Sequence, residues 1–108
     1  MPENNAVLMA LSMAKRAGKL VAGFDAVMKS AAAGEAKAII VSNALSLKTL
    51  KEAEFKSAQY QKPLLRAEFS LEQAEQMLGK RSGIYAVNDE HLVRLVEKKI
   101  GQSGTRMD

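Results

Sequence analysis

Cysteine is absent from this chain of 108 residues, and histidine occurs once, at His91. The missing cysteines exclude disulfides, thiolate metal ligands and cysteine nucleophiles, and they agree with a reducing cytoplasm, where we expect the protein to reside. His91 follows two acidic residues at the start of an expected helix, where a solvated side chain is the common role. No phosphate-binding loop, dinucleotide fingerprint or serine-nucleophile signature occurs either. The sequence therefore predicts no enzyme activity, no metal and no cofactor.

The chain also lacks any run that approaches the roughly 18 apolar residues of a membrane-spanning helix. The N-terminal segment Met1–Asn5 carries no basic charge, so we expect no signal peptide and no membrane partner. With 47% hydrophobic and 26% charged residues, the composition is typical of a globular domain. We expect one domain over residues 1–100, followed by a flexible, polar tail over residues 101–108.

Helical and strand patterns alternate along the chain. The run Ala38–Val41 has no polar alternation, which is typical of a strand buried on both faces. Strands are predicted near residues 20–22, 38–42, 63–67 and 84–87. Helices are predicted over 5–17, over 24–33, from a Ser46 cap to the break at 61–63, from a Ser70–Gln73 capping box through Leu78, and from Asn88 or Asp89 to Ile100. This order predicts an α/β sandwich, in which helices cover both faces of a small sheet.

Basic residues surround the first predicted strand. Lys15, Arg16 and Lys19 precede it, and Gly23 separates it from a helix that ends near Lys29. A strand, a glycine and a helix start place backbone N–H groups and the positive end of a helix where an anion can bind. An ordinary strand-to-helix turn is the alternative interpretation of the glycine alone.

A second basic pair, Lys80 and Arg81, precedes the fourth strand inside the glycine-bracketed segment Gly79–Gly83. If the loops before the first and fourth strands meet at one end of the sheet, the two clusters form one cationic patch beside Gly23. A net charge of +4 favours a polyanionic partner. Each basic pair alone is more often solvated surface, but together they indicate phosphate binding.

Several segments resemble the kink-turn RNA-binding ribosomal protein family, the family of large-subunit proteins seven-Ae and thirty-e. They are Ala14–Gly23, Val27–Ser30, Ala36–Val41 and Asn43–Ala44. Small bacterial members are the most similar, and the resemblance spans about residues 5–100. It implies a three-layer α/β/α sandwich with a four-stranded mixed sheet, and RNA binding without catalysis.

In that family, RNA contacts come from a Gly-x-Asn-Glu-x-x-Lys motif at the start of the second helix and from the loop before the last strand. Here Gly23 and Lys29 match the motif, whereas Asp25 stands where Asn is usual and Ala26 where Glu is usual. The segment Gly79–Gly83 has the position of the loop, but it is short and basic where kink-turn binders often carry apolar residues. These departures predict weaker kink-turn recognition.

We therefore expect a monomeric protein that binds structured RNA, such as a ribosomal or messenger RNA element, with the ribosome as an expected partner. The cations would hold phosphates, Gly23 would let the RNA backbone approach, and Asp25 would meet a base edge. The alternative is a protein-interaction scaffold of the same fold that has lost kink-turn recognition. The expected RNA-binding residues are Lys15, Arg16, Lys19, Gly23, Phe24, Asp25, Lys29, Lys80 and Arg81.

Overall fold

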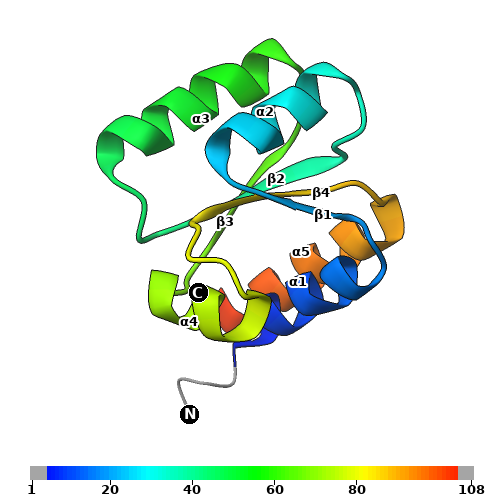
Figure 1. Cartoon of the computed structure of the whole chain (residues 1–108), viewed down its shortest axis with the longest axis vertical. Coiled ribbons are helices and arrows are strands. Elements are labelled where there is room, and N and C mark those ends of the chain that lie inside the picture. The colour runs from blue at the N-terminus through cyan, green and yellow to red at the C-terminus, as the bar shows by residue number, and fades with distance from the viewer. Residues whose placement is uncertain (1–4, 105–108) are drawn as a thin grey trace.

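The computed structural model describes residues 5–104, in which five helices pack around one four-stranded sheet (Figure 1). This arrangement confirms the predicted α/β/α sandwich and the predicted order of elements. The helices are α1 (Ala6–Arg16), α2 (Phe24–Ala32), α3 (Leu47–Gln59), α4 (Leu71–Leu78) and α5 (Glu90–Gly104), and the strands are β1 (Leu20–Ala22), β2 (Ala38–Ser42), β3 (Leu64–Ala67) and β4 (Ile84–Val87).

The sheet is mixed, with strand order β1-β4-β2-β3. Strand β4 lies between β1 and β2 and is antiparallel to both, since Val87 is paired with Leu20 on one side and with Ala38 on the other. Strands β2 and β3 are parallel, with Ile39 opposite Leu64. Strands β1, β2 and β3 therefore all run in one direction, and β4 alone runs in the other.

These directions give the sheet two different ends. One end holds the last residues of β1, β2 and β3 and the first residue of β4; we call it the Gly23 end, and it lies on the left in Figure 1. The opposite end, where β1 begins and β4 finishes, is called the Lys19 end. Because α2, α3 and α4 each follow one of the three parallel strands, all three helices start at the Gly23 end.

Both faces of the sheet are covered by helices, with α2 and α3 on one side and α1, α4 and α5 on the other (Figure 1). Alternate residues of β2 enter the two cores: Ile39 and Val41 pack under α2 and α3, whereas Ala38 and Ile40 face the other three helices. None of the four side chains is more than 1% exposed. This double burial explains why the strand is apolar without alternation, and it confirms the predicted burial of Ile39 and Val41.

The helix starts agree with their sequence signals. Ser46 and Asn5 accept hydrogen bonds from backbone N–H groups three residues later, and Ser70 forms the predicted capping box with Gln73. Helix α2 differs, because its N-cap is Gly23 and no side chain caps it. No helix within residues 5–104 is both long enough and apolar enough to cross a membrane.

The end of the chain differs from the prediction. Helix α5 ends at Gly104, beyond its predicted end at Ile100, so it includes the first residues of the segment that we expected to be a flexible tail. A glycine inside a helix costs only about 1 kcal/mol relative to alanine, and Ile100 still packs against the core at this point. The rest of the predicted tail, residues 105–108, lies outside the described residues.

Truncation of the central strand tests this packing. We predict that Ile39→Ala lowers the free energy of unfolding by about 2–5 kcal/mol, because Ile39 is fully buried and the deletion leaves a cavity. The measurement is a urea denaturation curve, with Leu47→Ala as control because Leu47 is 66% exposed. Equal midpoints for Ile39→Ala and the wild type would contradict the position of this strand.

Candidate nucleic-acid interface

The Gly23 end offers open backbone at the junction of β1 and α2. The Gly23 N–H donates to the carbonyl oxygen of Ile84 at 3.1 Å, so the end of β1 is held beside the start of β4. Gly23 has φ 97° and ψ 146°, a conformation that side-chain-bearing residues rarely adopt. A Cβ atom built there would meet nothing within 4 Å. The backbone is therefore accessible at the point where the uncapped N–H groups of α2 begin.

The first turn of α2 belongs to the segment Gly23–Lys29, which resembles the kink-turn motif, and part of it faces solvent. Asp25 and Ala26 are both exposed, while Phe24 is half-buried against the α2/α3 core. Asp25 also places a negative charge at the positive end of α2, which is a stabilising position for a carboxylate. Lys29 is exposed in the last turn of α2, the turn that leads toward the Lys19 end and not the turn that begins at Gly23.

The predicted loop Gly79–Gly83 reaches the same end of the sheet. Lys80 and Arg81 are exposed, and the side chain of Lys80 has no partner among the described residues. Arg81 forms an exposed ion pair with Glu75, with 3.5 Å between Nη1 and Oε1. A pair of this kind contributes little free energy in water, so Arg81 can exchange Glu75 for a phosphate at small cost.

Hydrogen bonds and packing fix the backbone of this loop. The carbonyl oxygen of Lys80 accepts from the Tyr85 hydroxyl at 3.1 Å and from the Ser82 N–H at 3.0 Å. Burial raises the pKa of Tyr85 to about 12, so the hydroxyl remains a donor near neutral pH. At the other end of the loop, a Cβ atom on Gly83 would lie 2.8 Å from Cδ2 of Leu45. Two basic side chains therefore project from a backbone whose conformation is held by the protein itself.

Lys15 and Arg16, in the last turn of α1, have different surroundings. Lys15 Nζ donates to the carbonyl oxygen of Leu78 at 2.6 Å, so Lys15 lies beside the start of the Gly79–Gly83 loop. Arg16 is exposed, and within residues 5–104 its side chain has no hydrogen bond or ion pair. The structure therefore brings Lys15 close to the second basic cluster, but the ammonium group already has a backbone partner.

Lys19 lies at the opposite end of the sheet. The N–H of Asn88, which follows β4, donates to the carbonyl oxygen of Lys19 at 2.9 Å. The expectation that Lys19 joins Lys80 and Arg81 at one end beside Gly23 is therefore wrong. Because β1 and β4 are antiparallel, the loop that enters β1 and the loop that enters β4 emerge at opposite ends.

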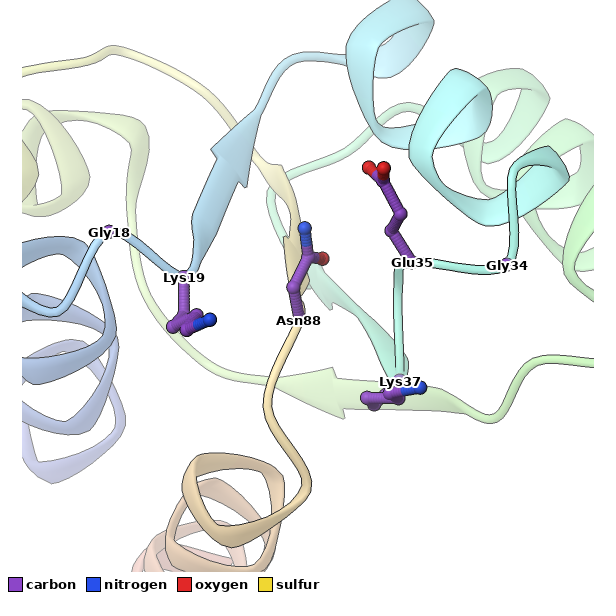
Figure 2. Close-up of a pocket in the computed structure, with 6 residues that line it drawn as sticks. All are labelled: Gly18, Lys19, Gly34, Glu35, Lys37 and Asn88. Atoms are coloured by element: carbon purple, nitrogen blue, oxygen red, sulfur yellow. The ribbon is translucent and has the colours of Figure 1, made fainter.

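Figure 2 shows the surroundings of Lys19, an open pocket of about 420 Å³ at the Lys19 end. Lys19 and Lys37 stand on either side of Asn88, and the side chain of Glu35 is directed toward α2 (Figure 2). Helices α1 and α2 both end here, so the two lysines complement the negative ends of these helices. The pocket lies at the opposite end of the sheet from Gly23 and the Gly79–Gly83 loop, so it is not part of the candidate interface. It is lined by Gly18, Lys19, Gly34, Glu35, Lys37 and Asn88.

The structure adds a region that the sequence did not point to. The segment from Asn43 to Leu47 joins β2 to α3 at the Gly23 end, and Asn43, Ala44 and Leu47 are exposed there. The position of this segment directly after a predicted strand could have indicated it, because segments that follow parallel strands meet at the carboxyl ends of those strands. That inference requires knowing that β1 and β2 run in the same direction.

No protein-family model and no curated protein matches this sequence. Solved structures do match. A protein of unknown function from Bacillus halodurans superposes with a TM-score of 0.80 and 24% identity, covering 90% of this chain and 98% of that chain. A 15.5 kD RNA-binding protein from Giardia lamblia superposes with a TM-score of 0.72 and 10% identity, covering 94% of this chain and 88% of that chain. These similarities show a shared fold.

Proposed function

We propose that this protein binds structured RNA without catalysis, through the Gly23 end of the sheet. One observation carries the proposal: the open backbone at Gly23, the uncapped start of α2 and the basic loop Gly79–Gly83 lie together. Phosphates would meet the N–H groups of α2 and the side chains of Lys80 and Arg81. The shared fold with the Giardia protein, which is described as RNA-binding, supports this proposal.

The Gly23 end has no fully exposed aromatic ring within residues 5–104, which favours folded RNA over an unpaired strand as the ligand. Proteins that bind single strands stack bases on exposed aromatic side chains. Here Tyr85 is fully buried and Phe24 is half-buried against the α2/α3 core, so neither is a fully exposed ring of the kind on which single-stranded bases stack. A folded RNA would instead be recognised through its backbone and shape.

The finer proposal is an RNA of the ribosome or a kink-turn element in ribosomal or messenger RNA, bound by a cytoplasmic monomer. The resemblance of Gly23–Lys29 to the kink-turn motif supports it. Asp25 and Ala26 occupy exposed positions in the first turn of α2, where the usual Asn and Glu would face the RNA. Ionised Asp only accepts hydrogen bonds, and Ala offers none from its side chain. We therefore propose that kink-turn selectivity is weak.

A protein-interaction scaffold is the second candidate. Leu47 and Phe55 are 66% and 70% exposed on α3, which is unusual for large apolar side chains. RNA affinity falls steeply as salt rises, whereas apolar protein contacts respond much less. Salt dependence of binding therefore separates the two functions.

Removing the loop charges tests the RNA interface. We predict that Lys80→Ala with Arg81→Ala weakens binding to different structured RNAs by a similar factor. The slope of log affinity against log salt concentration should also become shallower, by roughly one unit for each phosphate contact that is lost. The matched control is Lys19→Ala with Lys37→Ala, which removes the same charge at the Lys19 end. Fluorescence anisotropy over a salt series gives both quantities. Equal losses of affinity for the two pairs, or no loss for the loop pair, would exclude the Gly23 end as the site.

Restoring the family motif tests the kink-turn proposal. We predict that Asp25→Asn with Ala26→Glu raises affinity for a kink-turn RNA by about 1–3 kcal/mol, the range of a good bidentate base contact. Affinity for a duplex of the same length and charge should change much less, so the duplex serves as the control. Tight, kink-turn-selective binding by the wild type would show that the two departures do not weaken recognition.

A further inference from the structure

Two side chains of α1 donate hydrogen bonds to carbonyl groups at the C-terminus of α4. The last turn of α4 contains no basic residue of its own. Instead, the Ser12 hydroxyl donates to the carbonyl oxygen of Met77 at 3.2 Å, and Lys15 Nζ donates to that of Leu78 at 2.6 Å. Ser12 and Lys15 are three residues apart on α1 and therefore share one face of that helix. Two consecutive terminal carbonyl groups of α4 are thus satisfied by α1.

The residue that follows α4, Gly79, lies close to the ammonium group of Lys15. Gly79 has φ 76°, the left-handed conformation that commonly ends a helix, and its N–H donates to the carbonyl oxygen of Glu75 at 2.9 Å. A Cβ atom on Gly79 would lie 3.2 Å from Lys15 Nζ. The glycine therefore lets the chain leave α4 sharply and also leaves room for Lys15.

The first part of the Gly79–Gly83 loop is consequently held by two sets of contacts. Lys15 and Ser12 fix the point where it leaves α4, and Tyr85 fixes the backbone at Lys80. A charged donor on a helix C-terminal carbonyl makes a stronger hydrogen bond than a neutral one, and the charge also complements the helix dipole. Lys15 is therefore the strongest of the contacts between α1 and the start of the loop.

We propose that Lys15 is a positioning residue for RNA binding, which holds the Gly79–Gly83 loop in place through the carbonyl group of Leu78. The proposal rests on the proposed function, and it replaces the phosphate contact that we expected for Lys15. A loop that is already ordered loses less conformational entropy when it binds, so fixing it increases the affinity contributed by Lys80 and Arg81.

A double-mutant cycle distinguishes positioning from direct phosphate contact. Lys15→Met keeps the aliphatic part of the side chain and removes the donor and the charge. We expect it to lower affinity for a structured RNA on the order of tenfold in the wild-type background. In the background of Lys80→Ala with Arg81→Ala, we expect a decrease of less than about twofold. The cycle is measured at low salt, where the weakened variants still bind.

Arg16→Met is the matched control, because Arg16 is the next residue, is also exposed, and has no partner within residues 5–104. Any effect of Arg16→Met should be the same in both backgrounds. An equal effect of Lys15→Met in both backgrounds would show that Lys15 contacts the RNA directly, and it would overturn the proposal.

Amide hydrogen exchange of the free protein tests the same inference without RNA. The N–H groups of Gly79, Ser82 and Ile84 are hydrogen-bonded within or beside the loop. Lys15→Met should raise the exchange rates of these amides on the order of tenfold, whereas Arg16→Met should leave them unchanged. Lys15→Arg keeps a charged donor, so its exchange rates should stay close to those of the wild type. Unchanged exchange in Lys15→Met would overturn the positioning role even if RNA binds. If the wild type binds no RNA, the proposed function fails, and altered exchange would still support the fixation of the loop by Lys15.

Discussion

The antiparallel pairing of β4 with both of its neighbours determines that Gly23 and the loop before β4 lie at the same end of the sheet. Strand β4 lies between β1 and β2 and pairs with Leu20 on one side and Ala38 on the other through Val87. This pairing places the start of β4, and the basic loop before it, beside Gly23. It also separates Lys19 from that loop by the full length of β1. Without β4 in this direction, the open backbone and the basic loop would not share one end of the sheet.

The two ends of the sheet consequently differ in electrostatic character. Helices α2, α3 and α4 all start at the Gly23 end, so their positive N-termini add to the charges of Lys80 and Arg81. Helices α1 and α2 finish at the Lys19 end, near Lys19, Lys37 and Glu35. Helix α5 starts at this end, and the Asp89 carboxylate caps it by accepting a hydrogen bond from the Leu92 N–H. The polarity of the helices therefore favours an anionic ligand at the Gly23 end.

Local patterns in the sequence were sufficient to predict the elements of the fold. The unbroken apolar run of β2, the Ser70–Gln73 capping box and the Ser46 cap all depend on residues close together in the chain, and the structure confirms each of them. Which residues come together in the candidate interface depends instead on contacts between residues that are far apart in the sequence. The position of Lys19 follows from the direction of β4, and the bond from Lys15 to Leu78 joins residues 63 positions apart. No periodicity within one segment contains that information.

The central claim is that RNA binds at the Gly23 end of the sheet. The most direct measurement is a titration of the ¹⁵N-labelled protein with a structured RNA at low salt, followed through the backbone amide chemical shifts. The account predicts that the largest changes occur in residues 23–26 and 79–83, with little change at Gly18, Gly34 and Asn88. Largest changes at the Lys19 end or around Phe55 on α3, or no change at RNA concentrations far above that of the protein, would contradict it.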